Sequence, residues 1–255
     1  MLIRMFKSWR IGSAFGFPIE INLSFLLLLA VVFIAFGGIA GVVIVLSAFA
    51  SVLLHELGHA LVARHFGVRV SGIELSFFGG AAKMVELPRT ANHEVAIAAA
   101  GPAVSLALGG LGFGLAAITH VSAFAWLGWT NVILAGFNLL PALPMDGGRI
   151  LRALLTRKMD FVRATDVSVT VSRAFAIAFA VIGVMGAYQL LILAPLLWIM
   201  GTRERMVARM MAHHFVSTGD GYRHRVHHPF DSPPPPRRFA IRQVNGRLAV
   251  VVEEP

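Results

Sequence analysis

Long apolar stretches dominate the chain, and short polar or glycine-rich connections separate them. A helix needs about 20 apolar residues to cross the hydrocarbon core of a bilayer. On this measure the pattern predicts about six membrane-spanning helices, at residues 22–37, 39–63, 94–118, 122–140, 168–186 and 188–202. The sequence therefore indicates a mainly α, polytopic membrane protein.

Two segments beside the first two predicted helices show a different period. Residues 9–22 hold two glycines, a proline and β-branched positions, and residues 68–87 alternate apolar with polar or small residues around Gly79 and Gly80. Alternation with a period of two is typical of strands. We expect small β-strands at the cytoplasmic face, and such strands could bind an extended substrate segment. The alternative for residues 9–22 is an unstructured basic leader.

After about residue 205 the apolar runs give way to a polar tail. Pro233–Pro236 predicts a stiff polyproline spacer. Beyond it, two alternating runs meet at Asn245-Gly246, a strong signal for a β-hairpin. We therefore divide the chain into a six-span core, a His/Pro-rich cytoplasmic linker and a C-terminal β-hairpin, at 1–205, 206–236 and 237–255. A lone hairpin is marginal in water, so we expect it to pair with the strands nearer the N-terminus or with a partner chain.

Composition and charge place these helices in a membrane. The chain is 57% hydrophobic and 14% charged, whereas a soluble domain carries about 25% charged residues. The net charge of +9 would suit nucleic acid, but the connections at 37–38, 119–121 and near 187 hold no Lys or Arg. Basic residues gather in the other connections and at both ends, which is the positive-inside pattern. We expect both termini in the cytoplasm, an inner bacterial membrane and no nucleic-acid partner.

Three polar side chains interrupt the second predicted span, in the run His55-Glu56-Leu57-Gly58-His59. Polar groups are costly in hydrocarbon, so they indicate a functional site. On a helix the two histidines lie one turn apart on one face, where neutral imidazoles can bind zinc. The glutamate on the adjacent face can take a proton from a bound water and pass it to a leaving amine. H-E-x-x-H has the chemistry of a metallopeptidase. The alternative, solvated histidines on a surface helix, does not suit an apolar segment.

A third zinc ligand must be a histidine or a carboxylate, because the chain has no cysteine. The fourth predicted span ends in a segment broken by Pro141 and Pro144, with Asp146 close behind. Irregular backbone at membrane depth is expected where it is buried in protein or lines a water-filled site. Asp146 is the only acidic residue between Glu94 and Asp160. We predict it as the third ligand of one zinc ion per chain; the alternative is a helix-capping aspartate.

The run HELGH at 55–59 and the pattern N-x-x-P-x-x-P-x-D-G at 138–147 together resemble the site-2 protease family of intramembrane zinc metalloproteases. The similarity also touches FFGGAA at 77–82 and AAAGPAVSLAL at 98–108, and it covers roughly residues 10 to 205. It implies zinc held by His55, His59 and Asp146, with Glu56 as the general base. We expect a compact member of the family, without PDZ-like or CBS-like domains.

The resemblance also implies residues that position the substrate. Asn138 is expected to position or polarise the scissile carbonyl, and Pro141 to shape the broken helix around it. We add Gly79 and Gly80 to this group. Members of the family cut transmembrane segments of membrane-tethered regulators and release a soluble fragment.

The sequence thus predicts a zinc-dependent intramembrane endopeptidase that hydrolyses a peptide bond in or near a transmembrane segment of a membrane-tethered regulatory protein. Its partners would be that substrate and the lipid bilayer. Two rival interpretations are a polytopic metal-binding transporter or sensor and a catalytically dead membrane scaffold. Glu56 argues against both, because neither needs a general base beside the first histidine. The substrate and the oligomeric state stay open.

Overall fold

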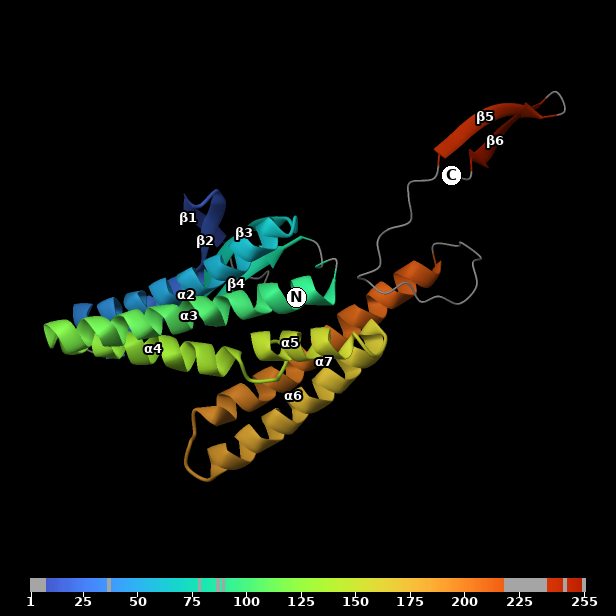
Figure 1. The fold of residues 1–255 in the computed structure, drawn as a ribbon. Helices are drawn as coiled ribbons and strands as arrows, with labels where there is room; N and C mark the ends of the chain where they lie inside the picture. The colour runs from blue at the N-terminus through green and yellow to red at the C-terminus, as the bar shows by residue number, and fades with distance from the viewer. Residues whose placement is uncertain are drawn as a thin grey trace.

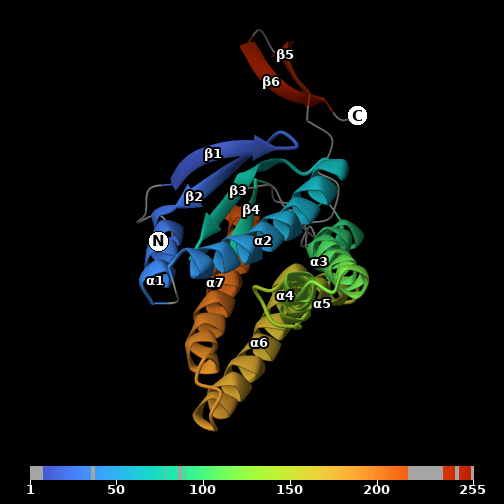
Figure 2. The same ribbon diagram turned by 90° about the vertical axis from the view of Figure 1, so that its left-hand side faces the viewer.

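The computed structural model describes residues 8–35, 38–77, 79–85, 88, 90–217, 238–244 and 247–253. Figures 1 and 2 show helices lying side by side with a small sheet against one of them. The helices are α1 (Leu23–Ala35), α2 (Ile39–His65), α3 (Ala91–Thr119), α4 (Ser122–Asn138), α5 (Asp146–Leu155), α6 (Phe161–Val184) and α7 (Leu190–Ser217). The strands are β1 (Ser8–Ala14), β2 (Phe17–Asn22), β3 (Val70–Ser76), β4 (Gly79–Met84), β5 (Arg238–Val244) and β6 (Arg247–Glu253). The prediction of a mainly helical membrane protein is confirmed.

Among the described helices, three are long and apolar enough to cross a membrane: most of α2, all of α3 and all of α6. Helix α1 has 13 residues and α4 has 17, so at 1.5 Å per residue they measure about 20 and 26 Å. Both fall short of the hydrocarbon core, which is about 30 Å thick. Helix α7 continues through the charged residues after 202 to Ser217, so the boundary drawn at residue 205 lies inside this helix. The number of six spans stays a prediction.

A four-stranded sheet confirms the strands expected within residues 9–22 and 68–87. Its order is β1-β2-β3-β4, and only the β2–β3 pair is parallel. The β1–β2 turn at Phe15 and Gly16 has positive φ at both residues. The leader is therefore a hairpin rather than an unstructured segment, and β4 is one edge of the sheet.

The sheet packs on α2 through a small apolar core. Phe17 and Ile73 from the sheet meet Leu57 and Ala60 from α2, all buried. On another side of α2, Gly58 allows α3 to approach, since a Cβ there would lie 2.9 Å from the carbonyl oxygen of Ala100. Burial of this kind holds the H-E-x-x-H turn between the sheet and α3.

Helices α6 and α7 form an antiparallel pair (Figure 1), and α6 contacts the rest of the molecule through α5 and through Phe137 near the end of α4. The segment between α4 and α5 is tied to this pair, because the Leu143 N–H donates to Ser172 Oγ of α6 at 2.7 Å. That bond places residue 172 at the depth of the loop that precedes Asp146.

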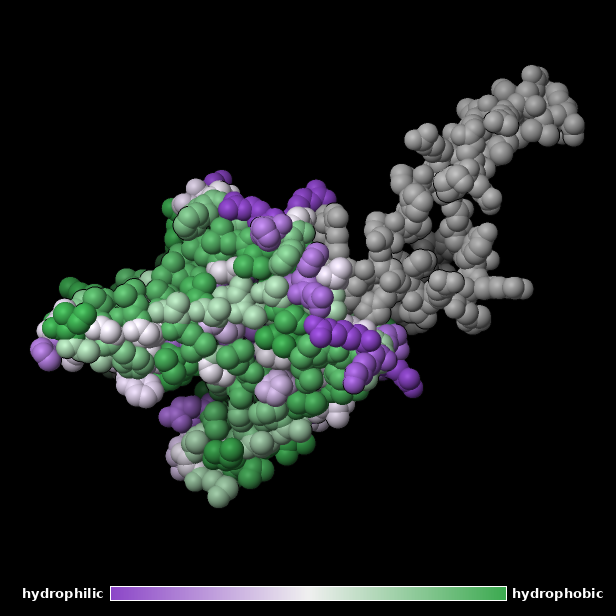
Figure 3. All heavy atoms as spheres, in the orientation of Figure 1, coloured by the Kyte–Doolittle hydropathy of each residue, from purple (hydrophilic) through white to green (hydrophobic). Residues whose placement is uncertain are grey.

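Apolar side chains cover most of the face of the helices seen in Figure 3, and polar residues gather toward one end. Large apolar residues at the far ends of the helices are exposed, among them Ile118 (79%) and Met185 (81%). An exposed apolar surface of this extent indicates contact with lipid.

Strand β5 pairs antiparallel with β6, and among the described strands neither joins the sheet of β1 to β4. In the part of the chain that the structure describes, the expected pairing with the N-terminal strands is thus absent, and pairing with a partner chain stays a prediction. Residues 245–246, where the turn was predicted, and residues 218–237, which include most of the predicted linker, lie outside the described residues.

Candidate metal centre

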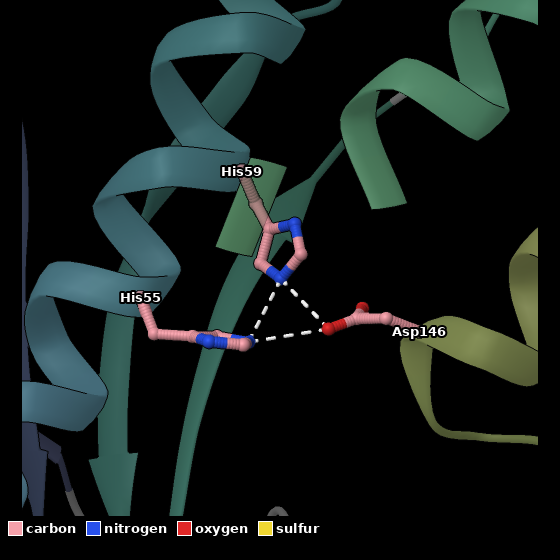
Figure 4. A group of neighbouring side chains, drawn as sticks. All are labelled: His55, His59 and Asp146. Carbon is pink, nitrogen blue, oxygen red and sulfur yellow. Dashed lines mark hydrogen bonds and ion pairs between the residues drawn. The ribbon is translucent and has the colours of Figure 1, made fainter. Parts of the chain in front are cut away.

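Three buried side chains converge between α2 and α5 (Figure 4). The Nε2 atoms of His55 and His59 are 3.2 Å apart, and each lies 3.1 Å from Oδ2 of Asp146. The exposed fractions of the three residues are 2%, 3% and 6%. The spacing of four residues on α2 therefore brings both rings to one point, and Asp146 reaches that point from another helix.

Asp146 is the first residue of α5, and its carboxylate does not cap the helix. The N-cap is Met145, which makes no side-chain capping bond. The proposed alternative, a capping aspartate, is therefore wrong. Glycines follow Asp146 because the preceding loop folds back on the helix: a Cβ on Gly147 would overlap the carbonyl of Leu139, and one on Gly148 would overlap Ala142.

Helix α3 orients both imidazole rings from the side opposite the convergence point. Nδ1 of His59 lies 2.7 Å from the backbone oxygen of Ile97, and Nδ1 of His55 lies 2.9 Å from Oγ of Ser105. A carbonyl oxygen can only accept, so Nδ1 of His59 carries the proton and Nε2 presents its lone pair. Outer hydrogen bonds of this kind fix the tautomer and direction of metal-binding histidines.

Gly101 of α3 leaves room for this arrangement. A Cβ on Gly101 would overlap Nε2 of both His55 and His59. The segment that packs α3 against α2 is thus also the one that clears space at the convergence point.

The three atoms suit a cation. Two imidazole nitrogens and a carboxylate oxygen aimed at one buried point form a set of donor atoms that a cation among them would stabilise. Ligands about 2.0–2.1 Å from a tetrahedral zinc ion lie about 3.3 Å from each other, and the observed separations are 3.1 to 3.2 Å. Two histidines and one carboxylate are also a ligand set of catalytic zinc sites, which leave one position for water.

Glu56 lies next to this cluster and contacts the edge strand of the sheet. Its Oε2 accepts a hydrogen bond from the backbone N–H of Ala82 in β4 at 2.9 Å. Gly80 permits this approach, since a Cβ there would lie 2.7 Å from Cγ of Glu56 and 2.9 Å from Cγ1 of Val52. Glu56 is thus held beside the cluster and is not one of the converging side chains.

The other predicted site residues lie around this centre. Asn138 ends α4, and its Nδ2 donates to the backbone oxygen of Leu134 at 2.9 Å. Pro141 is exposed in the loop before α5. Gly79 opens β4 with φ +116°, a backbone conformation that favours glycine. Whether these residues position a substrate stays a prediction.

A buried ion pair fastens α5 to α3. Nε of Arg152 lies 3.1 Å from Oε1 of Glu94, and Nη1 lies 3.1 Å from Oε2 of Glu204 on α7. Arg152 and Glu94 are 6% and 1% exposed. The helix that carries Asp146 is thereby held against the helix that orients the histidines.

Known proteins are similar to this chain in sequence and in fold. The family model for peptidase family M50 matches residues 42–121 and 113–179, more than half of the chain. The chain belongs to peptidase family M50. The solved structure of the site-2 protease from Methanocaldococcus jannaschii matches this M50 chain with a TM-score of 0.61 at 32% identity, over 78% of this chain and 95% of that one.

Curated relatives extend the comparison. The zinc metalloprotease of Methanocaldococcus jannaschii is 34% identical over 205 residues, which is 77% of this M50 chain and 60% of the relative. Stage IV sporulation protein FB of Bacillus subtilis is 33% identical over 129 residues, 49% of this chain and 45% of that protein. The chain thus spans about half the length of these two relatives. The predicted resemblance to the site-2 protease family is confirmed.

The sequence did not point to the residues of this M50 site that support the cluster from α3. Gly101 and Ser105 lie in the apolar run 98–108, which entered the sequence analysis only as part of the family resemblance, and the oxygen of Ile97 belongs to the backbone. A second residue of α5, Arg149, was also missed, although it follows Asp146 by three residues and so shares its helix face.

Proposed function

We propose that this M50 chain is a zinc-dependent intramembrane endopeptidase, with one zinc ion held by His55, His59 and Asp146. The observation that carries the proposal is the convergence of three buried ligand atoms within 3.2 Å of one another. Zinc bound there would supply a water of lowered pKa as the nucleophile and a Lewis acid for the scissile carbonyl.

Glu56 is the proposed general base. It follows His55 in the chain, and the N–H of Ala82 holds one of its carboxylate oxygens at 2.9 Å. The other oxygen is left to take a proton from the attacking water and to deliver it to the departing amine nitrogen. The backbone bond would fix the direction of the carboxylate, so little ordering is left for the reaction itself.

The position of the cluster supports a substrate inside the membrane. His59 and His55 stand six and ten residues before the end of α2 at His65, so they lie about 9 and 15 Å from that end of the helix. The surrounding helices expose apolar surface (Figure 3). We propose that the substrate is a transmembrane segment of a membrane-tethered regulatory protein, approached from the cytoplasmic side, with both termini of this chain on that side.

The outer edge of β4 is the proposed docking strand. Ala82 pairs with Ile73 of β3, but the backbone N–H of Ala82 donates to Glu56. This N–H therefore faces away from β3, toward the outer edge of the sheet. Alternate residues of an antiparallel strand face outward in the same way, which puts an open edge beside the general base. Two test substrates would carry N-methyl groups on alternate amides, one on the odd-numbered and one on the even-numbered residues. Cleavage should be lost in the substrate whose methylated amides face β4 and kept in the other; equal cleavage of both substrates would refute strand pairing.

The transporter and dead-scaffold alternatives are separated from a peptidase by the variant Glu56→Gln. Purified protein in liposomes should contain one zinc per chain in both wild type and variant, and only the wild type should cleave a generic transmembrane substrate. Zinc in both with cleavage in neither would favour the scaffold, and metal flux retained in the variant would favour the transporter. Absence of zinc from both would remove the basis of the proposal.

A further inference from the structure

Arg149 lies on the opposite side of Asp146 from the two histidines. Oδ2 of Asp146 faces both imidazoles at 3.1 Å, whereas Oδ1 lies 3.9 Å from Nη1 of Arg149. Nη2 of the same guanidinium lies 3.8 Å from Sδ of Met84 in β4. Arg149 therefore spans the gap between the helix that bears Asp146 and the edge strand.

These two contacts leave the guanidinium poorly satisfied. It carries five N–H donors in one plane, and a thioether sulfur is a weak acceptor. The ion pair with Asp146 is at the outer limit of distance, and the Arg149 side chain is only 23% exposed. Among the described residues, Arg152 one turn further along α5 bonds two carboxylates, and Arg209 bonds Asp166. Among the contacts of the described residues, Arg149 thus keeps donors without a protein acceptor, on a side chain that is partly open to solvent.

The acceptor that fits is a peptide oxygen. A planar guanidinium binds a carboxylate through two parallel hydrogen bonds and a carbonyl through one or two. Hydrolysis supplies both in turn: water adds across the C–N bond, the carbonyl carbon keeps the water oxygen as a carboxylate, and the nitrogen leaves as an amine. A strand along the outer edge of β4 would carry its carbonyls past Arg149.

We infer that Arg149 is a substrate-binding residue, which binds the carbonyl oxygen at the cleavage point and then the carboxylate of the new C-terminus. The inference rests on the proposed peptidase function. Asn138 was expected to serve the carbonyl, but one of its donors is bonded to Leu134 of its own helix. Arg149 is charged, and it reaches both Asp146 and β4.

The test measures by calorimetry how tightly two peptides bind to the zinc-containing Glu56→Gln protein in detergent. Both match the N-terminal half of the test substrate; one ends in a free carboxylate and the other in an amide. We expect the carboxylate to bind about 10-fold or more tightly, as for other charge-assisted pairs. Adding Arg149→Gln should remove most of this preference, and Arg149→Lys should keep part of it, since lysine retains the charge without the planar fork.

Arg157→Gln is the matched control. It removes a neighbouring arginine whose Nη2 bonds Asn92 on the surface, and it should leave the preference unchanged. Equal binding of the two peptides, or a preference that survives Arg149→Gln, would overturn the inference. It would also be overturned if the Arg149→Gln variant lost the preference only because it had lost its zinc. A preference that depends on Arg149 in a protein whose wild type never cleaves would uphold the binding site and count against the peptidase.

Discussion

Gly101 of α3 faces the two imidazole rings of α2, and a methyl group there would overlap both Nε2 atoms. We therefore expect Gly101→Ala to displace the rings from the convergence point and to lower the zinc content well below one per chain. Metal analysis of the purified variant measures this directly. The cause is steric and local, so the helix itself should remain.

Gly110→Ala is the control for that variant. Gly110 lies on the same helix, and a Cβ there meets nothing within 4 Å. Alanine in an open helical position is more favourable than glycine by about 0.5–1 kcal/mol, so zinc should stay bound and stability should hold or rise. Full zinc in Gly101→Ala would contradict the role of Gly101.

At the scale of residues, the grouping of the candidate ligands was predictable from residue type and spacing. His55, His59 and Asp146 followed from helix geometry and from the scarcity of acidic residues, and the structure brings them together. Ser105 and the oxygen of Ile97 were not predictable, because they meet the histidines across 50 and 38 residues of sequence. Such contacts depend on how α3 packs on α2, which no local pattern encodes.

At the scale of elements, α5 depends on its ion pair with α3. Arg152→Met would leave Glu94 charged and buried without its partner, which typically costs about 3–5 kcal/mol. We expect a large loss of stability in denaturant titrations in detergent, with weaker zinc binding because α5 carries Asp146. Adding Glu94→Leu should recover most of the stability.

The control for the ion pair is Arg209→Met. The Arg209 side chain is 55% exposed and bonds Asp166 at 3.2 Å on the surface, where ion pairs contribute little. The stability of the Arg209→Met variant should match that of the wild type. If Arg152→Met were equally harmless, α5 would be held by its apolar contacts instead.

The sheet carries a second ion cluster, which makes its stability depend on pH. Burial alone would raise the pKa of the Glu74 carboxyl, but hydrogen bonds from Lys83 and Asn22 and the charge of Lys83 outweigh it, and the pKa is lowered. Burial would lower the pKa of Lys83, but bonds to Glu20 and Glu74 raise it. The stabilisation by Glu74 is thus complete above its unfolded value of 4.5 and is lost as the pH falls through its lower folded pKa.

We therefore expect the stability difference between wild type and Glu74→Gln to be constant from about pH 6 to 9 and to shrink below about pH 4.5. Above about pH 10.5 it should shrink again, as the pH rises through the raised pKa of Lys83. Thermal unfolding in detergent, followed by tryptophan fluorescence, measures the difference. A difference that grows on acidification would show that the cluster is not stabilising.

Hydrophobic periodicity located the helices and the sheet, but it placed their ends poorly. Residues 188–202 were expected as a separate span, yet α7 runs on to Ser217 because its apolar and charged halves are both compatible with helix. The predicted span at 168–186 begins seven residues earlier, at Phe161, where Asp160 caps the helix by accepting from the N–H of Arg163. Period reports which face is buried, whereas capping sets where a helix starts.

At the scale of the whole molecule, the number of bilayer crossings depends on the shorter helices. Among the described helices, α2, α3 and α6 have the length and apolarity of a span. Helix α3 carries the chain from residue 91 to 119 and α6 from 161 to 184, so the chain must return between them. Helix α4 is too short alone, but with α5 it adds 17 and 10 helical residues, about 40 Å of helix. Asp146 is the first residue after the break between the two helices, so the metal centre lies within this return path.

The return path can be tested by labelling, because the chain has no cysteine to give a background signal. Single cysteines at the exposed positions Ser71, His120, Arg157 and Tyr188 are treated with a membrane-impermeant maleimide on intact cells and on inverted vesicles. We expect His120→Cys and Tyr188→Cys to react from outside, and Ser71→Cys and Arg157→Cys only in inverted vesicles. Reaction of His120→Cys and Arg157→Cys from the same side would mean that α4 and α5 do not complete a crossing, and the proposed return path would be wrong.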